Sequence, residues 1–345
     1  MRKVDSFKYK TKRILRRIIH KSTSPHGVIL MYHRIGSHVT DPWEIFVNEE
    51  NFRQQVAYLK KSFNVCSFSS LEETLQQKRG KKKNIFITFD DGCLDNFETA
   101  MPILRKYSLP ATFFIPTVIF GSQSIFWWEI LDLFFWRNEG LPETIQLEYS
   151  KGKFIRTLTP DMQKRNEIIE NRWSANREDA PNSRCRLYLE ICDWIRVQRP
   201  EDQRVITEQL LELNGEVLHE NKFFKKMSVE QILFLSNNYF EIGAHTIHHP
   251  ALKFHDHALQ LKEINDSISI LENILKKPVH SFAYPHGEYN EDTLSIIKGT
   301  GIKYACTTDW GAIYPDANPG ILPRILVRNM NVSYLKQQLH YLFKP

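Results

Sequence analysis

The sequence has few cysteines and no long hydrophobic run, and each shortage argues against a class of protein. Its five cysteines are scattered, odd in number and without a Cys-x-x-Cys pair. They are Cys66, Cys93, Cys185, Cys192 and Cys306. This pattern indicates neither a disulfide framework nor a cysteine zinc site, and it predicts reduced thiols. No apolar run approaches the roughly 18 residues of a membrane-spanning helix, so we expect no transmembrane segment.

The N-terminal extension, residues 1–26, also lacks the features of a secretory signal. It has neither an apolar stretch of about 7–15 residues nor a small-residue cleavage site, so we expect a cytoplasmic protein. Within residues 1–22, apolar side chains recur at helical spacing among many lysines and arginines. Two interpretations stay open: peripheral contact with the anionic inner face of a membrane, and a solvated extension. No nucleic-acid-binding motif is recognisable, so we expect no nucleic-acid partner.

What the sequence does contain is typical of a large globular protein. Of its 345 residues, 42% are hydrophobic and 25% charged, and the net charge is +6. Apolar runs of strand length alternate with amphipathic helical segments, which predicts a parallel sheet or barrel. The expected strands lie at 27–36, 85–89, 111–121, 239–250 and 280–290, and in YACTTDW and ILPRILV. The expected helices lie at 51–63, 70–80, 94–110, 227–238, 261–277 and 291–299.

The alternation is interrupted by residues 122–225, which we interpret as a largely helical insertion. This segment holds five of the seven tryptophans. They are Trp127, Trp128, Trp136, Trp173 and Trp194. The favoured interpretation is that these aromatic residues pack the core of the insertion or dock it on the main domain. The alternative is a patch that stacks on sugars or faces a membrane.

Two adjacent carboxylates, Asp90 and Asp91, directly follow the apolar strand at 85–89. Like charges this close raise one another's pKa, so a compensating group is needed, and a metal cation would provide it. A second cluster, HTIHHP, follows the apolar strand that begins at residue 239. Its His245 and His249 are spaced to bind one cation from one side of a compact loop.

The two clusters are expected to converge, because catalytic groups of parallel α/β folds gather at the C-terminal ends of the strands. One aspartate and two histidines would give three metal ligands and leave a coordination position open for water. The other aspartate would act as a base beside the metal.

The motifs TFDDG and HTIHHP resemble the first two motifs of the polysaccharide deacetylase family, the NodB homology domain or carbohydrate esterase family four. The resemblance implies that Asp90 is the general base and that Asp91, His245 and His249 hold a divalent metal. Zinc is the first expectation, with cobalt or nickel as alternatives. The implied fold is α/β, a distorted (β/α) barrel of about seven strands.

The resemblance covers residues 28–121 and 239–327 and leaves out the extension and the insertion. It therefore predicts one deacetylase barrel domain, residues 27–345, interrupted by residues 122–225. The order of the motifs and the flanking FFIPT also match the family.

The segment FAYPHG resembles the third family motif but departs from it at two positions. Ala283 stands where the family has an arginine, and His286 stands where an aromatic residue is usual. The resemblance implies that the His286 backbone N–H holds the oxyanion, and Tyr284 is expected beside the substrate. We expect Arg324, in the last strand, to replace the missing arginine at the same rim.

The late family motif that carries a histidine acid is missing from the C-terminal end. The segment VILMYHRI near the N-terminus resembles it, as in members that look circularly permuted. This similarity implies that His33 is the general acid. TTDWG is similar to a fourth motif, which implies that Asp309 and Trp310 support the acid.

Together these features predict metal-dependent removal of acetyl groups, N-acetyl first, from a sugar of a polysaccharide, glycolipid or glycan precursor. The alternatives are an O-acetyl carbohydrate esterase and a non-catalytic sugar-binding relative. The predicted cytoplasmic location favours a lipid-linked or nucleotide-linked acetylated sugar as the substrate.

Overall fold

The computed structural model describes residues 25–37, 40–76, 83–121, 125–176, 179–213 and 224–343. The basic segment 1–22 lies outside the described residues, so its membrane contact stays a prediction. Within the described ranges, no helix is both long enough and apolar enough to cross a membrane.

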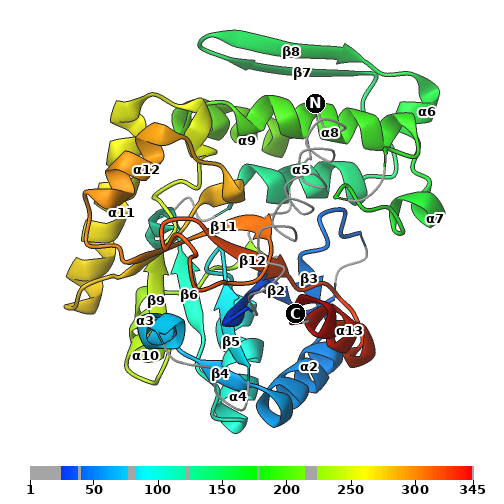
Figure 1. The fold of residues 1–345 in the computed structure, drawn as a ribbon. Helices are drawn as coiled ribbons and strands as arrows, with labels where there is room; N and C mark the ends of the chain where they lie inside the picture. Colours follow the sequence, from blue (N-terminus) through cyan, green and yellow to red (C-terminus); the bar gives the residue numbers. More distant parts are fainter. Residues whose placement is uncertain are drawn as a thin grey trace.

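Seven parallel strands of the described chain close into a barrel (Figure 1). The ring runs β1-β12-β11-β10-β9-β6-β5, and β5 pairs back onto β1 from Gly27↔Asn84 to Tyr32↔Phe89. The bounds are β1 Gly27–Tyr32, β5 Asn84–Phe89, β6 Thr112–Ile115, β9 Glu241–Ala244, β10 Ser281–Ala283, β11 Tyr304–Trp310 and β12 Leu322–Leu326. A further strand, β4 (Asn64–Cys66), pairs with the first half of β5. This confirms the predicted barrel of about seven strands.

The barrel strands are apolar throughout because both of their faces are covered. All six residues of β1 are buried, and five of the six residues of β5 are buried. One face of each strand lies inside the barrel and the other lies under helices, so the strands do not alternate between apolar and polar residues.

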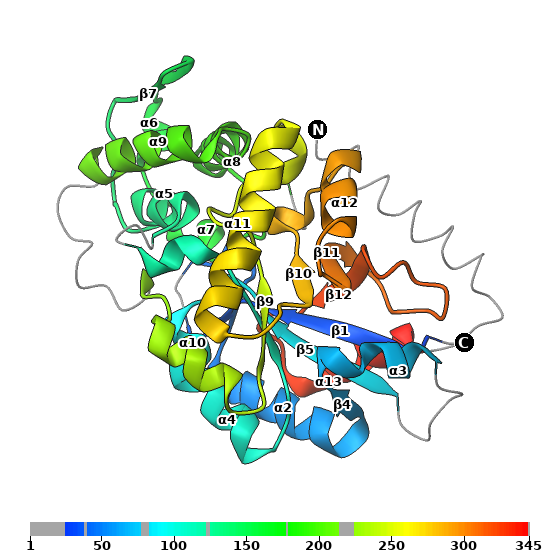
Figure 2. The same ribbon diagram turned by 90° about the vertical axis from the view of Figure 1, so that its left-hand side faces the viewer.

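Helices surround the barrel, and all of them except α13 lie where helical segments were expected (Figure 2). Their bounds are α2 Glu49–Ser62, α3 Leu71–Gln76, α4 Met101–Lys106, α10 Val229–Ser236, α11 His257–Leu275, α12 Glu291–Lys298 and α13 Val332–Leu342. The helix predicted at 94–110 differs, since a π-helical turn at Asn96–Ala100 precedes α4. In α11, Ile264, Ile268 and Leu271 are buried on one face, as the 3.6-residue period predicts.

The insertion packs around a hydrophobic core of its own and lies over one end of the barrel (Figure 1). It contains α5 Trp127–Trp136, β7 Thr144–Tyr149, β8 Gly152–Thr157, α6 Pro160–Gln163, α7 Glu167–Glu170, α8 Ser183–Arg196 and α9 Pro200–Leu213. Trp127, Trp136 and Trp173 are buried in that core, as the favoured interpretation predicts. The antiparallel hairpin β7–β8 was not predicted.

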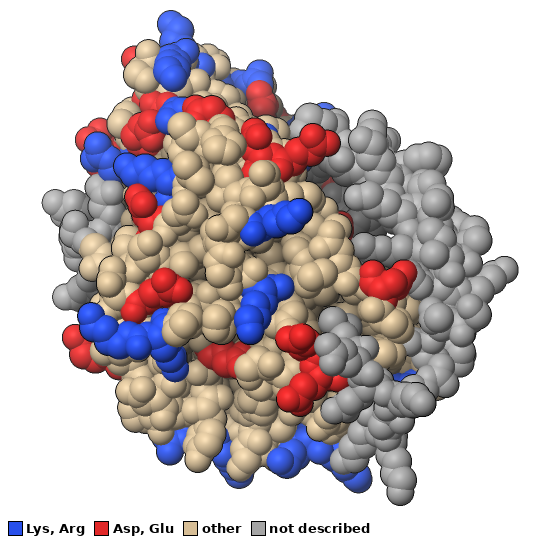
Figure 3. Space-filling view, turned by 60° about the vertical axis from the view of Figure 1, so that its left-hand side comes forward, with Lys and Arg blue, Asp and Glu red and all other residues tan. Residues whose placement is uncertain are grey.

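The surface of the described chain carries charges of both signs. On the face shown in Figure 3, Lys and Arg side chains lie among Asp and Glu side chains rather than forming a separate field. Mixed charge of this kind is usual for a globular domain.

Candidate metal and catalytic site

The predicted site residues come from neighbouring strands of the barrel. His33 directly follows β1, Asp90 and Asp91 follow β5, and His245 follows β9. Since the strands are parallel, their C-terminal ends form one rim, where such folds place their chemistry. The Asp90 backbone N–H donates to the Tyr32 carbonyl at 3.0 Å, which joins the ends of β1 and β5.

Asp91, His245 and His249 converge at this rim as a buried triad. Asp91 Oδ1 lies 3.6 Å from His245 Nε2 and 3.4 Å from His249 Nε2. One ligand atom from each residue lies within 4.8 Å of those of the other two. Asp91 Oδ1 is buried and has no hydrogen-bond partner among the described residues. A buried carboxylate oxygen facing two imidazole nitrogens fits a divalent cation such as zinc.

The turns that follow the strands aim these side chains at one point. Asp91 and Gly92 both adopt left-handed backbone, with φ of 72° and 63°. The carbonyl of Ala283 lies 2.7 Å from His245 Nδ1 and assigns the proton to that nitrogen, which leaves Nε2 free to bind a metal. His249 is also left-handed, and its backbone N–H donates to Thr246 Oγ1 at 3.0 Å.

The electrostatics of the triad suit a cation. Burial by itself would raise the pKa of Asp91, but the nearby His245, His249 and His33 lower this pKa below its usual range. Burial and the neighbouring His286 and His245 hold the pKa of His249 well below its ordinary value. The triad therefore presents an ionised carboxylate and a neutral imidazole, the forms that bind a metal.

Asp90 is held by a different partner, Arg324 of β12. Arg324 Nη1 donates to Asp90 Oδ1 and Nη2 donates to Asp90 Oδ2, each at 2.8 Å. Arg324 Nε also donates to the Thr307 carbonyl at 2.9 Å, and the Arg324 side chain is fully buried. A two-point pair of this kind fixes the orientation of the carboxylate. Replacement of the missing third-motif arginine by Arg324 stays a prediction.

His33 lies at the same rim. Its nearness contributes to the pKa shifts of Asp91, His249 and His286. Its Nδ1 atom is buried and has no hydrogen-bond partner within the described part of the chain.

The third-motif residues His286 and Tyr284 have different surroundings. The His286 ring lies 4.6 Å from the His249 ring, and the His286 backbone is left-handed. Tyr284 is fully buried, and its hydroxyl donates to the Gly320 carbonyl at 2.8 Å. A contact between Tyr284 and substrate stays a prediction.

Asp309 and Trp310 end β11. The Asp309 backbone N–H donates to Thr307 Oγ1 at 3.1 Å, and Trp310 is in register with Arg324. The Trp310 ring packs against Tyr341 of α13 at 6.1 Å. A supporting role for these two residues at His33 stays a prediction.

Sequence reasoning named Trp128 only in an alternative interpretation, as part of a patch that stacks on sugars, and did not place it beside the metal-ligand triad. The Trp128 ring lies 4.7 Å from the His249 ring. The exit of the insertion hydrogen-bonds the aspartate loop: Leu94 N–H donates to the Lys225 carbonyl at 2.9 Å, and Met227 N–H donates to the Gly92 carbonyl at 2.9 Å. The aromatic run SIFWWEI in the sequence indicated that aromatic rings gather here, but it could not show which ring faces the barrel.

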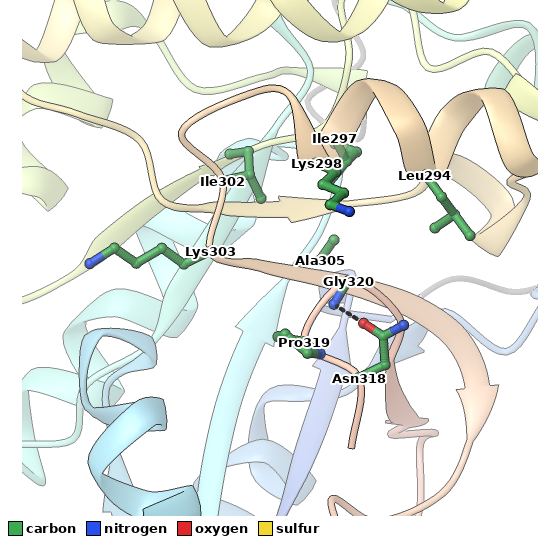
Figure 4. Close-up of a pocket in the computed structure, with 9 residues that line it drawn as sticks. All are labelled: Leu294, Ile297, Lys298, Ile302, Lys303, Ala305, Asn318, Pro319 and Gly320. Atoms are coloured by element: carbon green, nitrogen blue, oxygen red, sulfur yellow. Dashed lines mark hydrogen bonds between the residues drawn. The ribbon is translucent and has the colours of Figure 1, made fainter. Parts of the chain in front are cut away.

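A cavity of about 460 Å³ lies away from this site (Figure 4). Lys298 and Lys303 lie at its edge, beside Ala305, Asn318 and Gly320. These last three residues precede or begin β11 and β12, so the cavity lies toward the N-terminal ends of the strands. The metal-ligand triad lies beyond the C-terminal ends, and the cavity is therefore separate from it.

Known proteins are similar to this chain in sequence or in fold. Poly-beta-1,6-N-acetyl-D-glucosamine N-deacetylase of Staphylococcus aureus strain MRSA252 is 25% identical over 84% of this chain and 70% of its own length. The Staphylococcus epidermidis protein of the same name is 23% identical over 82% of this chain and 68% of its own length.

A solved structure, the Streptococcus pyogenes deacetylase PplD in complex with acetate, superposes with a TM-score of 0.55 at 21% identity. It covers 92% of this chain and 98% of its own. The family model for polysaccharide deacetylase matches residues 77–168 and 221–305, more than half of the chain. The chain therefore belongs to the polysaccharide deacetylase family and is a hydrolase of that class, which confirms the family and enzyme class predicted from the sequence.

Proposed function

We propose that the protein removes acetyl groups from N-acetylated sugars of a glycan in a metal-dependent hydrolysis. The observation that supports this most is that a metal-ligand triad and an oriented carboxylate lie side by side at one rim of the barrel. Asp91, His245 and His249 form a ligand set, and Asp90 stands beside it with its carboxylate fixed by Arg324.

The metal would be zinc, or cobalt or nickel in its place, held by the triad. A divalent cation at such a site supplies a Lewis acid that polarises the acetyl carbonyl. Asp90 takes the proton from the attacking water, and its two hydrogen bonds with Arg324 orient the carboxylate for this step. The His286 backbone N–H donates to the oxyanion. His33 gives a proton to the sugar nitrogen as the carbon–nitrogen bond breaks, which releases acetate and a free amine.

The substrate we propose is a polymer or oligomer of N-acetylglucosamine. Support comes from the name of the curated relatives, which act on poly-beta-1,6-N-acetyl-D-glucosamine. A lipid-linked or nucleotide-linked precursor is the second candidate, at the inner face of a membrane that the basic residues of segment 1–22 would contact. This location in the cytoplasm is part of the proposal.

Acetate release from a substrate panel tests the proposal. The panel contains β-1,6-linked N-acetylglucosamine oligomers, lipid-linked and nucleotide-linked N-acetyl sugars, and an O-acetylated sugar, each with zinc, cobalt or nickel. We expect zinc-dependent acetate release from the amide substrates. Release from the O-acetylated sugar alone would identify an esterase, and no release at all would identify a binding protein.

Two variants separate the role of Asp90 as the base from the role of the triad as metal ligands. Asp90→Asn should keep the metal and lose turnover by about 100-fold or more, since it removes the base and leaves the ligands intact. His245→Ala should lose the metal, as measured by elemental analysis. Full acetate release by Asp90→Asn, or unchanged zinc content in His245→Ala, would refute the assignments.

A further inference from the structure

The insertion presents one aromatic face to the rim of the barrel. Trp128, in the first turn of α5, is only partly buried, whereas the neighbouring Trp127 is buried in the core of the insertion. The Trp128 ring lies 4.7 Å from the His249 ring and 5.8 Å from the His286 ring. An aromatic side chain with part of its surface exposed therefore stands directly beside the metal-ligand triad.

Neighbouring side chains fix the position of the Trp128 ring. Phe126 stacks on Trp128 with ring centroids 4.3 Å apart and an interplanar angle of 11°. The Lys226 ammonium lies 4.4 Å from the Phe126 ring centroid, and the Phe126 backbone N–H donates to Glu129 Oε2 at 2.9 Å. Glu129 also pairs with Lys226. Trp128 is thus held in place before a ligand arrives, which lowers the entropic cost of binding one.

A small cavity with both apolar and polar walls adjoins Trp128 and reaches Asp91. Its walls include Arg34, Glu129 and Asp132, and its volume is about 20 Å³. That space is about one water molecule, so it can hold a single hydroxyl group but not a sugar ring. The cavity and Trp128 together offer what a pyranose needs: an aromatic plane for its apolar C–H face and polar groups for a hydroxyl on its edge.

We propose that Trp128 and this cavity form the subsite that binds the sugar ring carrying the acetyl group, so that the insertion determines specificity for a glycan. The sugar stacks on Trp128, one of its hydroxyls enters the cavity beside the paired Arg34 and Glu129, and its acetyl group extends toward Asp91. This inference rests on the proposed function, because it places the same substrate at the same triad. It assigns to Trp128 a contact that no family motif in the sequence supplies.

The test measures affinity separately from turnover. In an Asp90→Asn background, isothermal titration calorimetry gives the Kd of the zinc-loaded protein for a β-1,6-linked N-acetylglucosamine pentasaccharide. Trp128→Ala should raise this Kd at least about tenfold, and Trp128→Phe, which keeps a ring, by no more than about threefold. Trp194→Ala is the matched control, since Trp194 packs on Tyr149 and Phe154 of the hairpin side of the insertion. It should leave the Kd unchanged.

A second readout does not depend on the alanine variant folding. Binding of the pentasaccharide should change the tryptophan fluorescence of the Asp90→Asn parent, and Trp128→Phe should lose most of that change. Zinc content, measured for every variant, shows whether the triad is intact.

Two outcomes overturn the subsite: an unchanged Kd in Trp128→Ala at equal zinc content, or a full fluorescence change in Trp128→Phe. Either result beside an active wild type leaves the proposed function standing. A wild-type chain that neither binds nor deacetylates any glycan would overturn both proposals.

Discussion

Asp90 and Asp91 are adjacent in sequence, yet their side chains have different partners. Asp90 forms two hydrogen bonds with Arg324, and Asp91 faces the imidazoles of His245 and His249. The left-handed backbone at Asp91 and Gly92 makes this separation geometrically feasible, because it turns the chain sharply between the two carboxylates. Repulsion between the aspartates is offset on one side by a guanidinium and on the other by a ligand set for a cation.

Arg324→Lys should reduce kcat about 10–100-fold without loss of zinc, because a lysine ammonium cannot make the two parallel hydrogen bonds that orient Asp90. Arg324→Met should in addition lower the free energy of unfolding by about 3–5 kcal/mol, since it leaves a buried carboxylate unpaired. Urea denaturation and acetate release measure the two effects. In the double variant Asp90→Asn/Arg324→Met, stability should recover while activity does not. Wild-type kcat in Arg324→Lys would show that the pair is not needed for catalysis.

Asp132 gives a pH-dependent prediction. Burial, with smaller contributions from Asp41 and Glu129, raises the pKa of Asp132 to about 8, while the Tyr188 hydroxyl donates to its Oδ1 at 2.6 Å. The folded state therefore binds more protons than the unfolded state between about pH 4 and pH 8, and this group makes stability fall as pH rises through that range. Asp132→Asn removes this titration. The free energy of unfolding of the variant, relative to that of the wild type, should therefore rise by about 2–5 kcal/mol from pH 5 to pH 8.5. Urea denaturation at each pH measures it, and a gain that does not vary with pH would contradict the shifted pKa.

At the scale of elements, the exit of the insertion is part of the aspartate loop. Lys225–Met227 pairs with Gly92–Leu94 through backbone hydrogen bonds, and the Lys226 ammonium is buried against Glu129 of α5. Lys226→Met should lower the free energy of unfolding by about 3–5 kcal/mol, because it leaves a buried glutamate without its closest cation.

The matched double variant Glu129→Gln/Lys226→Met separates charge from packing. Removing both charges should recover most of the lost stability. The coupling energy of the double-mutant cycle gives the contribution of the Glu129–Lys226 interaction to the free energy of unfolding. A Lys226→Met protein as stable as wild type would mean that the neighbouring Arg34 alone satisfies Glu129.

The barrel elements could be predicted from sequence because each is an apolar run or a segment of 3.6-residue period. The β7–β8 hairpin was missed although β7 alternates between exposed residues and the buried Ile145 and Leu147. The alternation is only six residues long, it lies within a polar region, and β8 has no buried residue. The site residues were found because Asp90, Asp91, His245 and His249 lie in short local motifs. The position of Trp128 beside the site could not be predicted. Successive residues of a helix point about 100° apart, and only tertiary packing decides whether Trp127 or Trp128 faces the barrel.

At the scale of the whole molecule, zinc binding should stabilise the insertion together with the barrel. The insertion has a separate hydrophobic core, yet its exit pairs with the loop that carries Asp91 and its Trp128 covers His249. A ligand that binds only the folded state at 100 times its Kd adds about 2.7 kcal/mol to the free energy of unfolding. Tryptophan fluorescence reports mainly on the insertion, which holds five of the seven tryptophans.

Because of this coupling, added zinc should shift the fluorescence and the circular dichroism transitions by equal amounts in urea denaturation, and a chelator should reverse both shifts. His245→Ala, which lacks one ligand, should show neither shift. A zinc-dependent shift in circular dichroism with an unmoved fluorescence transition would show that the insertion unfolds independently of the site. The insertion would then be attached to the barrel without sharing its stability, and the positioning of Trp128 would have to be established by the glycan rather than before it binds.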